Sequence, residues 1–149
     1  MANKVNVSKK EEPLIDEGVM NEVYNFQYGL PGFEYFTEFT FEPIEEYPPF
    51  VLFKSVVDEN ISMYVLNAKY FQVYDELDIP KAELDKLELK DSKELGIYFI
   101  LRLDKVSQNF MANLKTPLII NKDKKIGNQI FLEQDNLEKN MYLNDALKE

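Results

Sequence analysis

Short segments rich in aromatic and β-branched residues recur along the chain from residue 22 onward, and polar or proline-containing segments separate them. Segments of this length and composition are typical of β-strands. Only one segment has a clear helical pattern, so the chain lacks the alternation of strands and helices that builds a parallel sheet. We therefore expect an all-β domain. The predicted strands are residues 23–27, 36–41, 50–57, 61–66, 97–103, 118–121 and 126–132.

The strand predicted at 97–103 illustrates the pattern. Ile97, Phe99, Leu101 and Leu103 alternate with Tyr98, Ile100 and Arg102, so the two sets lie on opposite faces of the strand. We interpret this alternation as a half-buried strand with one face on the core. Polar links such as residues 121–125, between two apolar segments, predict short hairpin loops and therefore antiparallel neighbours.

The helical segment is residues 80–87, where Pro80 suits the first turn and Leu84 and Leu87 fall on the same face. A second, shorter helical turn is expected within 67–71. Because so little helix is available to cover it, the sheet must curl over its own apolar face. The predicted architecture is a strongly bent, mostly antiparallel sheet that forms a barrel-like (pseudo-barrel) domain with one or two short helical turns.

The length of 149 residues predicts one domain with a core large enough to need no covalent staples. Residues 1–21 are polar and are interrupted by Pro13 and Gly18, so we expect a flexible or weakly ordered arm, followed by a single β domain over 22–149. The chain has no cysteine, no apolar run long enough to span a membrane and no apolar signal segment at its N-terminus. We expect a cytoplasmic protein.

Histidine is absent as well as cysteine, which removes the side chains most often used for proton transfer near neutral pH and for binding transition metals. The sequence also contains no nucleophile elbow, phosphate-binding loop or dinucleotide-binding glycine pattern. We therefore predict a protein that is not an enzyme and that uses no cofactor or metal. The alternative is a small β-barrel ligand binder or enzyme that works with carboxylates in its mouth.

The charge is distributed unevenly. Ten of the 27 acidic residues lie between Glu11 and Phe53, a segment with no lysine or arginine, and the formal net charge of -10 arises entirely there. Such a field repels nucleic acid and anionic membranes and attracts basic proteins. We expect no direct nucleic-acid or membrane binding. Composition leaves open whether the acidic face meets a basic partner or only keeps the protein soluble.

Residues 29–33 predict a tight turn. Pro31 sets the backbone angle of the first central position, and Gly32 accepts the positive φ that the second central position of a type II turn requires. Gly29, Pro31, Gly32 and Phe33 are therefore interpreted as structural, and Leu30 and Phe33 are free to pack beneath the turn. Glu34 follows the turn and is a candidate contact for a partner protein.

Further candidate contacts come from polar and aromatic residues near predicted loops. Asn113, Lys115 and Asn121 flank an apolar strand and either bond to loop backbone or contact a partner. Pro117 is interpreted as structural, at the start of its strand, where the missing amide hydrogen matters least. The aromatic content exceeds what one small core encloses, so some rings must be exposed. The candidates among them are Tyr47, Phe50, Tyr70 and Tyr74.

Three segments, in this order, resemble the signature of one family, the flagellar assembly factor FliW. They are residues 28–34 (YGLPGFE), 111–121 (MANLKTPLIIN) and 127–132 (GNQIFL). Members of that family have a bent, incompletely closed barrel, and they bind flagellin and the RNA-binding translational regulator CsrA without catalysis. The resemblance therefore implies a protein-binding regulator with these two partners.

On this resemblance, the chain would bind CsrA, displace it from flagellin messenger RNA and so relieve the repression of flagellin translation. Cytosolic flagellin would sequester the chain until that flagellin is exported. A flagellin-specific chaperone without a regulatory role remains an alternative, as does the small β-barrel enzyme or ligand binder.

Overall fold

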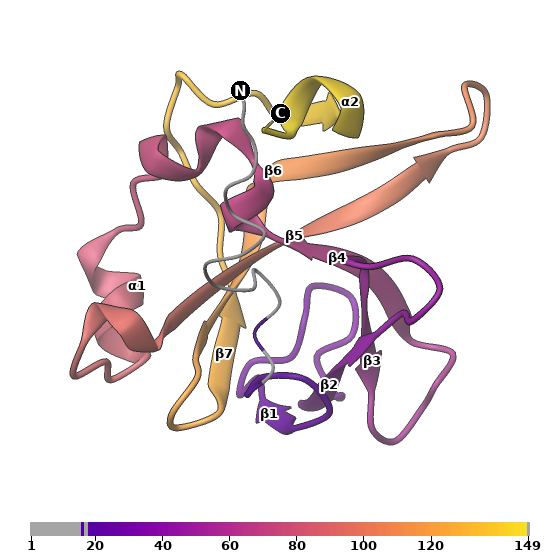
Figure 1. Cartoon of the computed structure of the whole chain (residues 1–149). Coiled ribbons are helices and arrows are strands. Elements are labelled where there is room, and N and C mark those ends of the chain that lie inside the picture. Colours follow the sequence, from indigo (N-terminus) through magenta and orange to yellow (C-terminus); the bar gives the residue numbers. More distant parts are fainter. Residues whose placement is uncertain (1–15, 17, 149) are drawn as a thin grey trace.

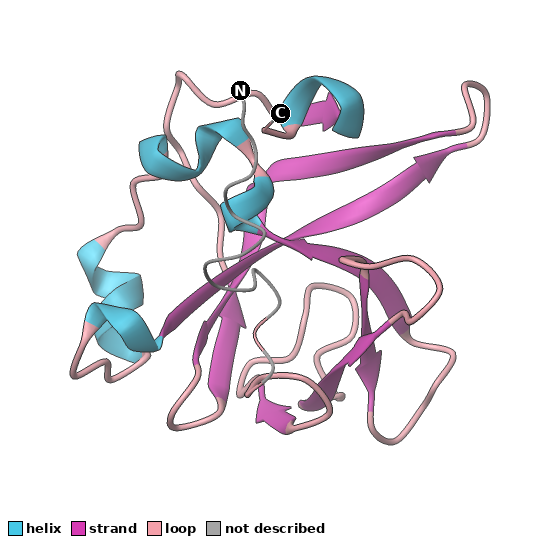
Figure 2. Cartoon of the chain, viewed as in Figure 1, coloured by secondary structure: helices cyan, strands magenta, loops and turns pink. Residues whose placement is uncertain are grey.

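The computed structural model describes Asp16 and residues 18–148, and most of the predicted N-terminal arm lies outside this range. Eight strands form the framework of the described chain (Figures 1 and 2), including a strand near the C-terminus that was not predicted. They are β1 (Val23–Asn25), β2 (Glu38–Pro43), β3 (Val51–Ser55), β4 (Ser62–Asn67), β5 (Leu95–Asp104), β6 (Asn109–Asn121), β7 (Ile126–Gln129) and β8 (Asn140–Tyr142).

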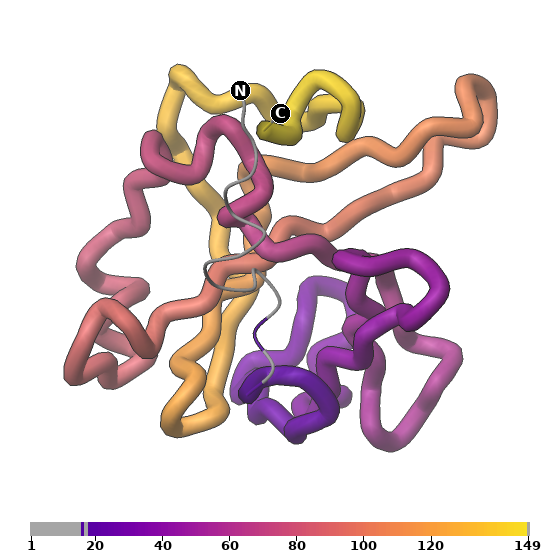
Figure 3. The backbone as a smooth tube through the Cα atoms, viewed as in Figure 1, coloured from indigo at the N-terminus to yellow at the C-terminus, as the bar shows by residue number. Residues whose placement is uncertain are grey.

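The strands form one bent sheet that closes on itself. Each strand from β1 to β6 pairs with the next one along the chain in antiparallel fashion. A parallel pairing of Asn25 with Ile126 joins β1 to β7 and completes the ring, and β8 lies beside the first half of β6. The predicted all-β pseudo-barrel is therefore confirmed, and the smooth trace in Figure 3 shows how sharply the sheet bends.

Short helices occupy the connection between β4 and β5 and the C-terminal end of the described chain. The predicted helix is α1 (Lys81–Lys86) with Pro80 as its N-cap, and the turn predicted within 67–71 is the 3₁₀ turn η1 (Ala68–Tyr70). Both predictions are confirmed. Three further short helices were not predicted: η2 (Gln72–Glu76), η3 (Ser92–Glu94) and α2 (Leu143–Ala146).

The barrel separates two hydrophobic cores. The inner core is rich in aromatic rings from β1, β2 and β3, with Phe39 and Phe53 stacked at a centroid distance of 4.6 Å. The outer core lies between β5 and β6 and the segments 66–89 and 130–147 that cover them. Val19 and Met20, which fall within the predicted arm, are buried in the inner core.

Strand β5 lies between the two cores, which corrects the prediction of a half-buried strand. Ile97, Phe99 and Leu101 are buried in the outer core, while Tyr98 is buried in the inner core. The alternation in the sequence was real, but segments distant in the chain cover the face that it assigned to solvent. Only the distal end of the strand is exposed, at Arg102 and Leu103.

Strand β6 carries an irregularity where its pairing with β5 shifts. Tyr98 pairs with Leu118 and Ile100 pairs with Asn113, so residues 114–117 lie opposite Phe99 alone. Pro117 therefore lies within a long, bulged strand and not at the beginning of a short one, which corrects its predicted position. Proline is tolerated at a bulge because the ladder of amide hydrogen bonds is already interrupted there.

The bulge is closed by the chain that follows β7. The amide of Leu132 donates to the carbonyl of Lys115 at 2.7 Å, and the amide of Ile130 donates to the carbonyl of Pro117 at 3.1 Å. The amide of Leu114 donates to the carbonyl of Lys139 at 2.9 Å. The segment 113–117 is thus held from both sides, and these three backbone groups have partners despite the broken ladder.

Candidate functional site

The clearest candidate for a binding surface is an open groove of about 530 Å³ beside the loop that joins β2 to β3. The loop contributes one wall, Tyr64 comes from β4, and Phe110 comes from the beginning of β6. We call it the aromatic groove. It is lined by Ile44, Glu46, Tyr47, Pro48, Phe50, Tyr64 and Phe110.

Aromatic rings form the floor of the aromatic groove. The ring of Phe110 meets the rings of Phe50 and Tyr64 edge to face, at centroid distances of 5.7 and 5.6 Å. Such contacts hold the rings in place. Tyr47 and Tyr64 remain 69% and 43% exposed, so the groove offers apolar surface to solvent. Exposed aromatic surface beside a concave site is typical of sites that bind other proteins.

The loop that forms the wall is held by its own backbone. The amide of Tyr47 donates to the carbonyl of Ile44 at 3.0 Å, and the amide of Phe50 donates to the carbonyl of Tyr47 at 2.9 Å. The amide of Ile44 donates to the carbonyl of Phe50 at 3.1 Å. These bonds fold the loop into consecutive turns. Tyr47 is therefore presented from a shaped loop and not from an extended one.

The loop beside the aromatic groove carries two neighbouring acidic side chains, of which Glu46 lines the groove. Glu45 and Glu46 are exposed, and neither forms an ion pair with any residue that the structure describes. Glu42, on β2, differs because its carboxylate lies 3.2 Å from the ammonium of Lys54. The groove thus combines an apolar floor with an uncompensated negative rim, an arrangement suited to an apolar group with positive charge beside it.

The predicted turn at 29–33 is present. The amide of Phe33 donates to the carbonyl of Leu30 at 2.7 Å, and Gly32 has the positive φ of 86° that a type II turn requires. Leu30 packs beneath the turn as expected and is buried in the inner core, but Phe33 is 41% exposed, so the expectation is wrong for Phe33. The turn directs the two apolar side chains differently, and only one reaches the barrel.

Glu34 is exposed, as predicted, and its carboxylate accepts a hydrogen bond of 3.1 Å from the amide of Gly32. Gly29 has a positive φ of 64°, and a Cβ atom there would lie 2.7 Å from the Cα of Glu34. The first glycine is therefore required for the close approach of two backbone segments. Glu34 stays a predicted partner contact, outside the residues that line the aromatic groove.

Asn113 and Lys115 lie at the bulge of β6, where their side chains bond to backbone. The amide of Lys115 donates to Oδ1 of Asn113 at 3.1 Å. Nζ of Lys115 donates to the carbonyl of Gln134 at 2.6 Å, and the side chain is half-buried. The side chain of Lys115 therefore joins β6 to the chain after β7, whereas that of Asn113 bonds within β6. A contact with a partner stays a prediction for them.

Asn121 is completely buried, and its carboxamide joins two loops. Oδ1 accepts hydrogen bonds from the amides of Asp123 and Lys124 at 2.9 and 3.1 Å, and Nδ2 donates to the carbonyl of Leu87 at 2.8 Å. The residue has no surface to offer a partner, so its prediction as a partner contact is corrected. Its role is the alternative one, bonding to loop backbone.

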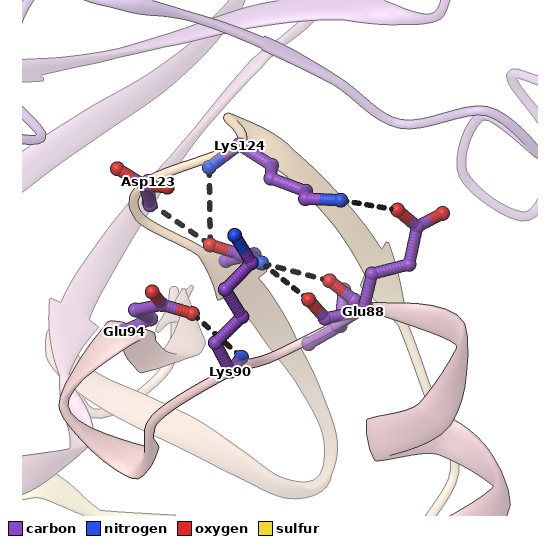
Figure 4. A network of polar contacts seen from close by, with 7 residues as sticks. Glu88, Lys90, Glu94, Asp123 and Lys124 are labelled. Carbon is purple, nitrogen blue, oxygen red and sulfur yellow. Dashed lines mark hydrogen bonds and ion pairs between the residues drawn. The ribbon is translucent and has the colours of Figure 1, made fainter.

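Polar contacts at the surface lie around this buried carboxamide (Figure 4). Nζ of Lys124 lies 2.6 Å from Oε1 of Glu88, and the amide of Lys90 donates to Oε1 of Glu94 at 2.9 Å. The hydrogen bond from Lys124 holds the pKa of the Glu88 carboxyl below its usual value, and the same contact raises the pKa of Lys124. The network joins the hairpin after β6 to the segment that follows α1.

The predicted aromatic contacts are separated in the fold. Tyr47 and Phe50 line the aromatic groove, whereas Tyr70 and Tyr74 lie on η1 and η2 and do not. Tyr70 and Tyr74 are both half-buried. Burial raises the pKa of Tyr70, and Nζ of Lys148 lies 5.8 Å from the ring centroid of Tyr74. Tyr64 and Phe110 line the groove but were not predicted as partner contacts. The only feature of the sequence that could have indicated them is that they are aromatic residues within apolar segments.

Metal-binding groups and membrane-spanning helices can be assessed for the part of the chain that the structure describes. No group of three or more acidic side chains there is arranged to hold a metal ion. None of the described helices is long and apolar enough to cross a membrane.

A sequence model of one family, described as "FliW protein", matches residues 13–143. The chain belongs to the FliW family. A flagellar assembly factor FliW from Bacillus velezensis is 36% identical over 124 residues, covering 83% of this chain and 85% of that protein. One from Clostridium botulinum strain Hall is 32% identical over 114 residues, covering 76% and 80%.

A solved structure agrees with the FliW assignment. A crystal structure of the flagellar assembly factor FliW superposes with a TM-score of 0.73 at 27% sequence identity, and the match covers 87% of this chain and 88% of the other. The family resemblance carried by residues 28–34, 111–121 and 127–132 is therefore confirmed. All three segments lie within the residues that the FliW family model matches.

Proposed function

We propose that this chain is a flagellar assembly factor that acts by binding proteins: it binds flagellin and the translational regulator CsrA, and by binding CsrA it relieves the repression of flagellin translation. The observation that carries the proposal is membership of the FliW family, together with relatives named flagellar assembly factors along most of the chain. We place this activity in the cytoplasm, where messenger RNA is translated.

The surface chemistry supports a protein-binding role. The aromatic groove presents half-exposed rings, and protein interfaces are enriched in such rings because they bury large apolar areas at little entropic cost. The groove contains one ionisable carboxylate, Glu46, and no nucleophile and base within reach of each other. A binder is therefore favoured over an enzyme that works with paired carboxylates.

The net charge of -10 supports the choice of a protein partner over a nucleic acid. A negatively charged protein is repelled by phosphates, whereas a basic RNA-binding protein is attracted at raised association rates. Bound to CsrA, the chain would add negative charge to the complex. That charge disfavours RNA even where the RNA site itself is left uncovered.

Size-exclusion chromatography of the purified chain, mixed separately with flagellin and with CsrA, tests the proposal. We expect co-elution with both proteins at low ionic strength and weaker CsrA binding as salt is added. Co-elution with flagellin alone would indicate a flagellin chaperone without the regulatory role. Co-elution with neither protein at micromolar concentration would refute the proposed function.

A further inference from the structure

We propose that the aromatic groove is a binding site for a methylated lysine side chain, which another protein presents on an exposed segment. The inference goes beyond the proposed function and does not depend on it, because it concerns the chemistry of a bound group and no particular protein. Three observations carry it: four aromatic rings line one groove, those of its floor stand nearly at right angles, and one carboxylate lines the same groove.

The rings offer more than apolar surface. The plane of Phe110 stands at 77° to that of Phe50 and at 78° to that of Tyr64. Rings set nearly at right angles form the walls of a corner, where one cation can lie close to more than one ring. Tyr47 adds a fourth ring, which is 69% exposed. Because the faces of aromatic rings are electron-rich, the groove attracts a cation as well as an apolar group.

A single carboxylate, that of Glu46, lines the groove beside the rings. Glu46 is exposed and forms no ion pair with any residue that the structure describes. Lys54, on β3, is already paired with Glu42 at 3.2 Å. The two described lysines that lie over aromatic rings do so at rings outside the groove. Within the described chain, therefore, no side chain supplies the positive charge that the groove favours, and a bound cation would supply it.

The lining favours a methylated ammonium group over an ordinary one. An unmethylated lysine ammonium has three N–H donors and is strongly hydrated, so an apolar site costs it free energy unless acceptors replace the water. The groove is mainly apolar, and Glu46 is its one charged acceptor. Trimethylation removes all three donors and surrounds the charge with methyl groups, which pack against ring faces. Arginine has five donors and is disfavoured for the same reason.

The shape of the groove favours a side chain presented by a protein over a free small cation. The groove is open and has a volume of about 530 Å³, which exceeds what one methylated ammonium group fills. The apolar surface continues along the β5–β6 hairpin (Figure 1), where Leu103 pairs with Phe110 and is 43% exposed. Residues paired across an antiparallel ladder share a face. This additional surface suits the methylene stem of a lysine and the residues beside it.

The test titrates the full chain with four probes while its chemical shifts are followed by NMR. Three probes are one short, otherwise uncharged peptide that carries trimethyllysine, unmodified lysine or a neutral isostere with a tert-butyl group in place of the trimethylammonium. The fourth is free choline. We expect trimethyllysine to bind about tenfold more tightly than the isostere, a factor within the range of cation–π contacts. We also expect it to bind more tightly than the lysine peptide and choline, with shifts at Tyr47, Tyr64 and Phe110.

Four results would overturn the inference. Equal binding of trimethyllysine and its isostere would show that the groove is only apolar. Equal binding of the lysine peptide would show that the groove selects charge and not methylation. Choline that binds as tightly as the peptide would show that a free cation suffices. Shifts confined to other residues, or no binding at millimolar concentration, would show that the groove does not take a methylated lysine.

A first pair of variants tests the rings. Tyr47→Leu with Tyr64→Leu keeps apolar side chains at two exposed positions but removes their rings. The control is Tyr35→Leu, because Tyr35 is 96% exposed and does not line the groove. We expect the double variant to lose most of the preference for trimethyllysine over the isostere, and the control to keep it. A preference that survives in the double variant would overturn the inference.

A second pair of variants tests the carboxylate. Glu46→Gln removes one negative charge from the groove, and Glu45→Gln removes the same charge from the neighbouring exposed residue, which does not line the groove. We expect Glu46→Gln to weaken trimethyllysine binding severalfold more than Glu45→Gln does, and equal losses would reject the site. Because every probe is a peptide or choline, a chain that binds neither flagellin nor CsrA would refute the proposed function and leave this measurement unaffected.

Discussion

The hydroxyl of Tyr98 donates a hydrogen bond of 3.2 Å to Oδ2 of Asp16, which joins the centre of β5 to the chain that precedes β1. The same oxygen accepts a hydrogen bond from Nδ2 of Asn67 at 3.2 Å, and the ammonium of Lys122 lies 3.7 Å from Oδ1. Burial and the nearby carboxylate raise the pKa of Tyr98 well above its usual value. The phenol therefore stays protonated and remains a donor, and Asp16 holds together three parts of the barrel wall.

Replacing Asp16 with alanine should lower the free energy of unfolding by about 1–3 kcal/mol, because the buried hydroxyl of Tyr98 loses its acceptor. Urea unfolding followed by circular dichroism measures the change. Glu59→Ala serves as the control, since Glu59 is exposed, and should leave the midpoint in place. An unchanged unfolding midpoint in Asp16→Ala would show that the contacts of Asp16 do not stabilise the barrel.

Tyr24 leads to a prediction at neutral pH. Its ring is fully buried and meets Phe41 edge to face at 5.5 Å, but its hydroxyl has no hydrogen-bond partner among the described residues. Tyr24→Phe removes this unsatisfied group and keeps the ring. We expect the free energy of unfolding to rise by about 1 kcal/mol at pH 7, as measured by denaturant unfolding. A loss of stability would indicate that the hydroxyl is satisfied in solution.

The same residue predicts an effect of alkaline pH. Burial, with the charges of Asp16 and Glu22, raises the pKa of Tyr24 to about 12, whereas an unfolded tyrosine titrates near 10. Between these values the unfolded chain releases its proton first, so stability falls as pH rises from about 10 to about 12 and is fully present below that range. Unfolding measured across this range should show a shallower loss in Tyr24→Phe than in the wild type. Tyr35→Phe, at an exposed position, should follow the wild-type curve.

Asn121→Ala should destabilise the protein strongly. The substitution removes two accepted and two donated hydrogen bonds at a fully buried position, and it leaves the carbonyls of Leu87 and Glu88 without this donor. We expect a loss of about 2–4 kcal/mol in the free energy of unfolding. Asn109→Ala, at an exposed position at the beginning of β6, is the matched control and should change little. Similar losses in both variants would contradict the role assigned to Asn121.

The two glycines of the 29–33 turn allow backbone strain to be separated from steric clash. Both have positive φ, but a Cβ atom at Gly32 meets nothing within 4 Å, whereas one at Gly29 lies 2.7 Å from the Cα of Glu34. Gly32→Ala should cost about 1–2 kcal/mol from the backbone angle alone. Gly29→Ala should cost more, because backbone must also move. Thermal unfolding of both variants gives the comparison, and equal losses would show that the clash relaxes freely.

Much of the fold was predictable because its signals are local. The turn at Pro31 and Gly32 follows from backbone angles that these two residues prefer in any context. The hairpin loop at 121–125 follows equally from a polar link between two apolar segments, and the amide of Lys125 does bond to the carbonyl of Asn121 at 2.8 Å. The all-β class follows from the repeated short apolar segments.

The errors arose wherever a residue's surroundings come from distant parts of the chain. Phe33 and Leu30 are both apolar and adjacent to one turn, yet only Leu30 reaches the inner core. Pro117 lies in a bulge of β6, where the chain after β7 bonds to the carbonyls of residues 115 and 117. Asn121 is a typical loop residue by type, and only the docking of the segment after α1 buries it.

The sequence by itself determined the strand class, the turns, the acidic charge and the family, since these depend on residue type and on neighbours along the chain. Tertiary structure alone decided which apolar residues are exposed and which polar ones are buried. The aromatic groove is the clearest case, because Tyr47, Tyr64 and Phe110 meet only once the barrel has closed. Burial and contact between distant segments are properties of the packed chain, and no local pattern encodes them.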